Sequence, residues 1–292
     1  MRKGIILSGG MGTRLYPCTR VVSKQLLPIY DKPLVYYPLS TLMLAGIRDI
    51  MIITSPADSE PFQALIGDGS QWGLNVQYRI QQEPRGIPEC FRIAEDWIDG
   101  HDVALILGDN IFYGNDLITR FNAATNNDAG CTIFAYHVSD PERFGVIELN
   151  PGGKLKAIVE KPKVAPTNYA VTGLYFYDSK VVDYAWKIHP SARGELEITD
   201  INNLYLQNGD CAVEYLNRGI AWIDAGTFEA LSEASTFVGS VQRRTGMMIA
   251  CPEEIAFRKS WIPRSYIEDA ARKYSKSDYG KYLTRIITEV SL

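Results

Sequence analysis

The sequence has little of what a disulfide-stapled scaffold or a histidine-based centre requires. Its 292 residues include only five cysteines, none in a Cys-x-x-Cys pair, and three histidines that lie far apart. An odd number of scattered cysteines argues against a disulfide framework or a zinc site and favours a reducing, cytoplasmic environment. The histidines have no metal-binding spacing, so we expect each to be a structural or surface residue.

Long apolar runs and an excess of positive charge are also missing. Even runs such as Val103–Leu107 are far shorter than the roughly 20 residues of a membrane helix. The apolar run behind Arg2 and Lys3 covers only residues 5–7, which is too short for the core of a signal peptide. The net charge of −4 makes the chain as a whole a poor partner for nucleic acid. We therefore expect a protein that binds neither membranes nor nucleic acids.

Two common phosphate-binding motifs are absent as well. No Gly-Lys-Ser/Thr triplet closes a P-loop, and no third glycine completes the Gly-x-Gly-x-x-Gly pattern of a dinucleotide-binding loop. The first apolar run is followed instead by Ser8-Gly9-Gly10-Met11-Gly12-Thr13-Arg14. Three glycines within four positions allow the backbone to approach a ligand closely and to direct successive N–H groups at an anion. Together with the positive charges of Arg14 and Lys24, this segment predicts a polyphosphate site.

The first half of the chain alternates strand and helix patterns. Short apolar runs are typical of buried strands, and helical patterns lie between them. This alternation predicts a mainly parallel sheet with helices on both faces, in a Rossmann-like three-layer α/β/α fold. In such sheets ligands bind beyond the carboxyl ends of the strands, where the glycine-rich segment lies. The expected strands are residues 3–7, 50–54, 74–80 and 103–107, and the expected helices are 34–45, 60–66 and 89–98, with Pro33 and Pro88 in first helical turns.

The second half changes to a mixed pattern and then to helices. We expect an α/β domain over residues 1–226, in which about 130–226 forms a mixed sheet, and a helical C-terminal segment over 227–292. From residue 240 onward Lys and Arg outnumber Asp and Glu by 10 to 6, which fits a solvated surface, an anionic effector or a neighbouring subunit. The expected strands are 131–138, 145–149, 155–159 and 169–177, and the expected helices are 179–188, 198–207 and about 227–245, 253–259, 264–274 and 278–290.

Four charged residues are candidates for binding a metal ion or an anion. Asp109 directly follows an apolar run, and Asp224 ends another. Two carboxylates at one sheet edge suit Mg²⁺, which is usually held by one or two carboxylates together with phosphate oxygens. Each could also be an ordinary turn or helix-capping aspartate. Lys161, which the following proline is expected to hold extended, and Arg193 on a loop could bind an anion or simply face solvent.

Taken together, these segments resemble the bacterial sugar-1-phosphate nucleotidylyltransferases, and the likeness covers essentially the whole chain. The resemblance implies the nucleotidyltransferase fold and an enzyme that converts glucose 1-phosphate and dTTP, with UTP as an alternative, into a nucleotide sugar and pyrophosphate with the help of Mg²⁺. It also implies the first step of dTDP-rhamnose synthesis for cell-surface polysaccharide. The matching segments are residues 4–33, 38–48, 67–70, 107–112, 140–146, 160–162, 169–177, 193–200 and 251–256.

The resemblance also implies a role for each site residue. Arg14 and Lys24 would contact the nucleotide phosphates, and Gln81 the edge of the base. Asp109 and Asp224 would hold Mg²⁺. The family is typically homotetrameric and often inhibited by a nucleotide sugar at a separate site. The other implied contacts are Leu7, Gly9, Gly10, Gly12, Thr13 and Gly86 for the nucleotide, Gly145, Glu160 and Val171 for the sugar hydroxyls, and Lys161 and Arg193 for the sugar phosphate.

Two segments depart from the family pattern. Met11 stands where the family usually has serine, and Gly86-Ile87-Pro88-Glu89 stands where thymidylyl-transferring members typically have Gly-Leu-Ala-Gln. An ionised glutamate only accepts hydrogen bonds, whereas glutamine also donates them. The preference between dTTP and UTP therefore stays open.

The chemistry implied by the resemblance needs no general base, because a sugar 1-phosphate is already a dianion near neutral pH. The lack of a convincing catalytic histidine therefore fits. Two rival functions use a similar fold. A non-catalytic sensor of nucleotide sugars would be expected to have lost Arg14, Lys24 or one of the aspartates, and none is lost. A glycosyltransferase would usually show Asp-x-Asp, where this chain has Asp109-Asn110-Ile111.

Overall fold

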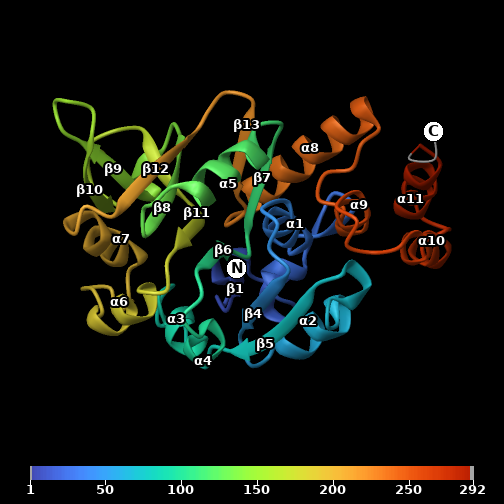
Figure 1. The fold of residues 1–292 in the computed structure, drawn as a ribbon, viewed down its shortest axis with the longest axis horizontal. Coiled ribbons are helices and arrows are strands. Elements are labelled where there is room, and N and C mark those ends of the chain that lie inside the picture. The colour runs from blue at the N-terminus through green and yellow to red at the C-terminus, as the bar shows by residue number, and fades with distance from the viewer. Residues whose placement is uncertain (1, 290–292) are drawn as a thin grey trace.

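A mixed sheet forms the centre of the computed structural model, which describes residues 2–289 (Figure 1). The strand order is β10-β9-β11-β6-β1-β4-β5, with β8 also pairing with β11 and β12 with β8. The four strands expected in the first half, β1, β4, β5 and β6, are parallel to one another, as predicted. β1 (Lys3–Ser8) pairs with β4 (Asp49–Thr54) and β6 (Val103–Leu107), and β4 pairs with β5 (Asn75–Ile80).

The sheet becomes mixed at β11 (Tyr169–Tyr177), which confirms the change of pattern in the second half. β11 runs antiparallel to β6 and to β8 (Cys131–His137). β9 (Gly145–Leu149) and β10 (Leu155–Glu160) form an antiparallel hairpin, and β9 also contacts β11. The structure adds β12 (Cys211–Leu216), which was not expected and pairs in parallel with β8.

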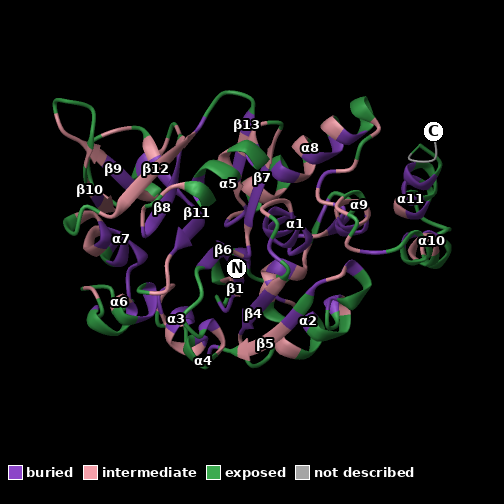
Figure 2. Cartoon of the chain, in the orientation of Figure 1, coloured by how far each residue is buried: buried purple, intermediate pink, exposed green. Residues whose placement is uncertain are grey.

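The central strands are buried on both faces (Figure 2). Ile6, Ile50 and Ile52 belong to one core, whereas Ile5 and Met51 belong to the other. Strands covered on both sides have no polar face, which is why they read as unbroken apolar runs. The expected three-layer α/β/α fold is thereby confirmed. The first core takes in α1 (Tyr36–Leu44), α2 (Ser59–Ile66) and α5 (Leu117–Asn126), and the second α3 (Glu89–Ile93), α4 (Glu95–Ile98), α6 (Val181–Lys187) and α7 (Ile198–Gln207).

The C-terminal part is helical, as expected, and position 290 of the last expected helix lies outside the described residues. α9 (Pro252–Arg258), α10 (Arg264–Lys273) and α11 (Asp278–Glu289) add side chains to the first core. α8 (Phe228–Thr245) instead covers a small third core that includes Ile29 and Tyr37. No helix within residues 2–289 is long and apolar enough to cross a membrane.

Two expected helices differ from the structure. The helix expected at 34–45 begins at Tyr36, and Pro33 lies not in its first turn but in a hairpin of β2 (Pro28–Ile29) and β3 (Lys32–Pro33). Proline can end a short edge strand as well as begin a helix, so its position alone could not decide. The helix expected at 89–98 is broken into α3 and α4 at Ala94, and both pieces bury apolar side chains in the second core.

The packing of the C-terminal segment can be tested at Gly73. This residue has a φ of 67°, and a Cβ there would lie 2.6 Å from the carbonyl oxygen of Trp261, between α9 and α10. We expect Gly73→Ala to lower the free energy of unfolding, measured with urea, by more than the roughly 1–2 kcal/mol of left-handed backbone alone. Gly209→Ala is the control, because Gly209 has a φ of 72° and a Cβ there would meet no atom within 4 Å. Equal losses in the two variants would contradict the contact.

Candidate active site

The candidate site lies at the carboxyl ends of the parallel strands. The glycine-rich segment follows β1, Gln81 follows β5, and Asp109 follows β6, so the sheet topology gathers them at one edge. Glycine is needed at two points of the segment. A Cβ on Gly9 would lie 2.3 Å from Oε1 of Gln81, and Gly12 has a left-handed φ of 60°. A side chain at position 9 would therefore require the Gln81 amide to move, and one at position 12 would have to adopt a left-handed backbone conformation.

Two adjoining cavities, of about 240 and 490 Å³, collect nearly all the residues predicted for the site. They share Asp109, Glu160 and Lys161 as common lining. Gly12 and Thr13 line neither cavity and instead lead into a short 3₁₀ turn. The smaller cavity also contacts Leu7, Gly9, Gly10, Lys24, Gln81, Gly86 and Arg193, and the larger one Arg14, Gly145, Val171 and Asp224.

Lys24 and Asp109 form an ion pair between the two cavities. The Lys24 ammonium is hydrogen-bonded to Oδ2 of Asp109, and both side chains are less than one-fifth exposed. Burial pushes the pKa of Asp109 upward, but Lys24 and the amide of Asn110 outweigh that effect and hold the pKa below its usual range. Asp109 is therefore ionised at neutral pH.

Asp224 reaches the same place through a separate two-stranded ladder. β13 (Ile220–Asp224) runs antiparallel to β7 (Asn110–Gly114), and its last residue pairs with Asn110. The amide of Ala225 donates to the carbonyl oxygen of Asp109 at 3.0 Å. Burial and the neighbouring Asp109 carboxylate raise the pKa of Asp224 to about 6, against the attraction of Lys24, Arg143 and Arg14. The two carboxylates, which both line the larger cavity, thus repel each other.

This pair of carboxylates fits a hard divalent cation. A cation between them would remove the repulsion that raises the Asp224 pKa, and carboxylate oxygens are ligands that Mg²⁺ prefers. Within residues 2–289 no group of three or more His, Cys, Asp or Glu side chains could hold a metal ion by itself. Mg²⁺ does not need such a cage, because it commonly takes the rest of its ligands from substrate phosphate and water.

On the other side of the cavities, two cations face carboxylates. Arg193 donates to Oε2 of Glu197 at 2.7 Å and to Oε1 of Glu160 at 3.2 Å. The Lys161 ammonium lies 3.8 Å from Oε1 of Glu160. Lys161 has a φ of 41°, so the extended conformation expected from the following proline is wrong. A positive φ in a residue that is not glycine is strained, and here it occurs where β10 ends at the cavity.

Two side chains that contact the carboxylates, Asn110 and Arg143, were not predicted as site residues from the sequence. Asn110 is 1% exposed and donates to Oδ1 of Asp109 at 2.9 Å, while its own oxygen accepts from Gly173 N at 3.0 Å and Trp222 Nε1 at 2.6 Å. An asparagine directly after the aspartate that ends a buried strand was the available signal. Nothing in the sequence pattern marked Arg143, whose Nη2 lies 3.9 Å from Oδ2 of Asp224, because the contact joins distant segments.

Known proteins with similar sequences cover nearly the whole chain. A sequence model of the family described as "Nucleotidyl transferase" matches residues 3–241. A glucose-1-phosphate thymidylyltransferase of Xanthomonas campestris pv. campestris is 54% identical over 98% of this chain and 97% of its own length. One from Neisseria meningitidis serogroup A is 52% identical over 98% of this chain and 99% of its own length.

Solved structures agree with the sequence comparison. A Bacillus anthracis protein described as a glucose-1-phosphate thymidylyltransferase, in complex with sucrose, is 42% identical, with a TM-score of 0.76 over 81% of this chain and 95% of that one. UDP-glucose pyrophosphorylase in complex with UDP-glucose shares the fold at 23% identity, with a TM-score of 0.71 over 82% of this chain and 99% of that one.

The chain therefore belongs to the nucleotidyl transferase family. Within that family it is similar over nearly its full length to the glucose-1-phosphate thymidylyltransferases. The predicted resemblance to sugar-1-phosphate nucleotidylyltransferases, and the expectation of an enzyme, are confirmed.

The raised pKa of Asp224 predicts a pH-dependent affinity for metal. A proton on Asp224 must leave before a cation binds, so protonation competes with the metal below a pH of about 6 and no longer does so above it. We expect the affinity for Mn²⁺ alone, followed by electron paramagnetic resonance from pH 5 to 8, to fall by about tenfold per pH unit below that point. Asp224→Asn should lack the inflection, and a flat profile in the parent protein would contradict the assignment.

Proposed function

We propose that this enzyme uses the two cavities to join dTTP and glucose 1-phosphate into dTDP-glucose, with release of pyrophosphate. The observation that carries the proposal is the Lys24–Asp109 ion pair, with Asp224 beside it, at the junction of the two cavities. In this assignment the smaller cavity takes the nucleoside and the larger one takes the sugar. The phosphates of both substrates would lie at the shared lining, with Arg193 in the wall of the smaller cavity and Arg14 in the wall of the larger one. The identity to the relatives named above supports the choice of both substrates.

The chain's own residues would act by holding two anions together. The sugar phosphate is a dianion and attacks the α-phosphorus in line with the departing pyrophosphate, so no side chain has to remove a proton. Lys161 and Arg193 would orient the sugar phosphate, and Arg14 and Lys24 would bind the triphosphate. Such enforced proximity can lower the barrier by about 7–11 kcal/mol.

Mg²⁺ would be held by Asp109 and Asp224 and would supply positive charge to the phosphate oxygens. The role of Lys24 follows from its contact with Asp109. Its ammonium neutralises one of the two carboxylates, and Lys24 lines the smaller cavity, which is assigned to the nucleotide. The role of Arg14 is supported by its position on the Asp224 side, where a Cβ on Gly226 would lie 3.6 Å from Nη1 of Arg14.

The base would be read by Gln81, which is 4% exposed. Its Nε2 donates to Oε2 of Glu89 at 2.8 Å and to the carbonyl oxygen of Gly86 at 3.2 Å, so its Oε1 remains as an acceptor. Thymine and uracil both offer an N–H donor at N3, whereas cytosine offers an acceptor there. Glu89, the departure from the family pattern, thus fixes the Gln81 amide for a base of the thymine and uracil type.

We also propose the remaining properties implied by the resemblance. They are a homotetramer, feedback inhibition by a nucleotide sugar, a product used for dTDP-rhamnose and cell-surface polysaccharide, and work in the cytoplasm. The division into residues 1–226 and 227–292 belongs to the same proposal. A separate cavity of about 480 Å³, bordered by Tyr113, Arg258 and Lys259, supports an effector site apart from the reaction. The five cysteines are all free, which supports a reducing compartment.

Substitution of single charges tests the mechanism. We expect Asp109→Asn and Lys161→Ala each to reduce kcat by at least about 100-fold, comparable to the loss of one oxyanion-stabilising donor. The exposed pairs Asp96–Arg79 and Lys156–Glu148 provide matched controls, so Asp96→Asn and Lys156→Ala should keep the parent rate. Near-normal turnover in either site variant, with the fold intact, would refute the assignment.

A pyrophosphate-release assay with glucose 1-phosphate tests the choice of nucleotide. We expect turnover with dTTP and UTP and none with CTP, ATP or GTP. dTTP and UTP differ by the thymine methyl and the ribose 2′-hydroxyl, and burial of the methyl alone is worth only about 0.8 kcal/mol, or a factor of a few. Release with none of the five would support a sensor in place of an enzyme, and equal use of CTP would refute the role given to Gln81.

A further inference from the structure

The segment that carries Lys24 continues directly into the β2–β3 hairpin. The amide of Val35 donates to the carbonyl oxygen of Gln25 at 2.8 Å, and β2 pairs with β3 further out. Residues 24–35 therefore form one closed loop with Lys24 at its base and Tyr30 and Asp31 at its tip. A movement of the tip would shift the base as well, because the two are joined by a short, backbone-paired ladder.

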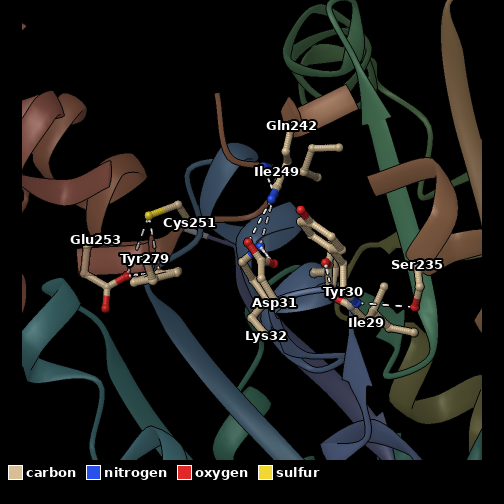
Figure 3. A network of polar contacts seen from close by, with 11 residues as sticks. Ile29, Tyr30, Asp31, Lys32, Ser235, Gln242, Ile249, Cys251, Glu253 and Tyr279 are labelled. Atoms are coloured by element: carbon tan, nitrogen blue, oxygen red, sulfur yellow. Dashed lines mark hydrogen bonds and ion pairs between the residues drawn. The ribbon is translucent and has the colours of Figure 1, made fainter. Parts of the chain in front are cut away.

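The tip is fastened to α8 by a buried polar network (Figure 3). The Lys32 side chain is 2% exposed and pairs with Oδ1 of Asp31. Gln242 of α8 joins this network through both the nitrogen and the oxygen of its side-chain amide. Its Nε2 donates to Oδ2 of Asp31 at 2.8 Å, and its Oε1 accepts from Lys32 Nζ at 3.3 Å and from Ile249 N at 2.9 Å. A buried ammonium is costly without polar partners, so the positions of Asp31 and Gln242 around Lys32 are constrained by its charge.

The same helix also follows directly after the strand that carries Asp224. α8 begins shortly after Asp224 and is capped by Thr227, whose hydroxyl accepts from Ala230 N at 3.2 Å. Along its length it also meets the hairpin tip, where Tyr30 N donates to the hydroxyl of Ser235 at 3.3 Å. Tyr30 has a φ of 60°, a conformation that its surroundings must hold in place. One helix thus connects the Asp224 strand with the loop that carries Lys24.

We propose that Gln242 is a positioning residue for the reaction, which holds the Lys24 ammonium against Asp109 through the hairpin. Gln242 touches no reactant. It holds the tip of the loop in one conformation. Lys24 can then bind the nucleotide phosphates without the conformational entropy cost of ordering the loop. The inference rests on the proposed function in assigning those phosphates to Lys24.

The test compares Gln242→Met with a matched control in full-length enzyme. Methionine keeps the length of the side chain but removes both polar ends of the network. We expect the KM for dTTP to rise and kcat to fall, with kcat/KM for dTTP reduced at least about tenfold, since a displacement of about 1 Å can cost about 100-fold. The KM for glucose 1-phosphate should not change, because Lys161 and Arg193 stand on other elements.

Tyr279→Phe is the control because it cuts a second network in the same C-terminal segment. The Tyr279 hydroxyl contacts Glu253 and Cys251 and makes no contact with the hairpin. It should lower the melting temperature without changing either KM. Ser235→Ala removes only the hydrogen bond from Tyr30 N, and we expect it to raise the KM for dTTP by less than Gln242→Met does. This second variant keeps the proposal testable if Gln242→Met fails to fold. Unchanged KM for dTTP in both α8 variants, Gln242→Met and Ser235→Ala, would overturn the proposal.

A double-mutant cycle with Lys24→Ala separates positioning from general damage. If Gln242 acts through Lys24, Gln242→Met should have almost no further effect on kcat/KM for dTTP once Lys24 is gone. Additive losses would overturn the inference. An inactive parent enzyme would instead be the failure of the proposed function, so the two outcomes are distinguishable.

Discussion

An imbalance of charge at one sheet edge governs the candidate site. Two carboxylates, Asp109 and Asp224, are held beside each other, and one ammonium, Lys24, is hydrogen-bonded to only one of them. Asp109 keeps its charge because Lys24 stays with it, whereas the pKa of Asp224 is raised. Arg143, whose Nη2 lies 3.9 Å from Oδ2 of Asp224, and Arg14 also attract this carboxylate, but they do not outweigh burial and the charge of Asp109. In the proposed function, a metal ion held by the two carboxylates would offset the remaining repulsion.

The sheet topology explains why the carboxylates meet. Asp109 is placed by β6, whose neighbour β1 leads into the glycine-rich segment, so the phosphate-binding backbone and the first carboxylate share one edge. Asp224 comes from a distant part of the chain and reaches Asp109 only because β13 pairs with β7. Asn110 locks that corner, since its side chain is hydrogen-bonded to Asp109, to Gly173 of β11 and to Trp222 of β13. These hydrogen bonds join the Asp109 corner of the site to β11 and β13.

The sequence allowed prediction of the features that depend on local pattern. The buried strands, the glycine-rich segment and Asp109 are all marked by residues next to one another in the chain. The β7–β13 ladder was not expected, because each strand is short and its partner is remote. Pro33, which ends the hairpin at residues 28–33, was predicted to open the next helix, because proline suits either structure. The positive φ of Lys161 was missed for a related reason, since its amide donates to the carbonyl oxygen of Phe144 and this contact outweighs the local preference of a residue before proline.

The cations of the sugar side are already engaged, and this has a consequence for recognition. Arg193 and Lys161 face Glu160, and Thr199 donates to the same carboxylate at 2.5 Å. A phosphate dianion that draws the two cations away leaves Glu160 with free acceptor capacity in the cavity. That capacity suits a sugar hydroxyl, which can donate to the lone pairs that the cations release. In the proposed assignment, free phosphate would draw Arg193 and Lys161 away and leave Glu160 with Thr199 alone, whereas the hydroxyls of a sugar phosphate would replace the two cations as donors. Under that assignment, the ion pairs around Glu160 would favour the complete substrate over its charged part.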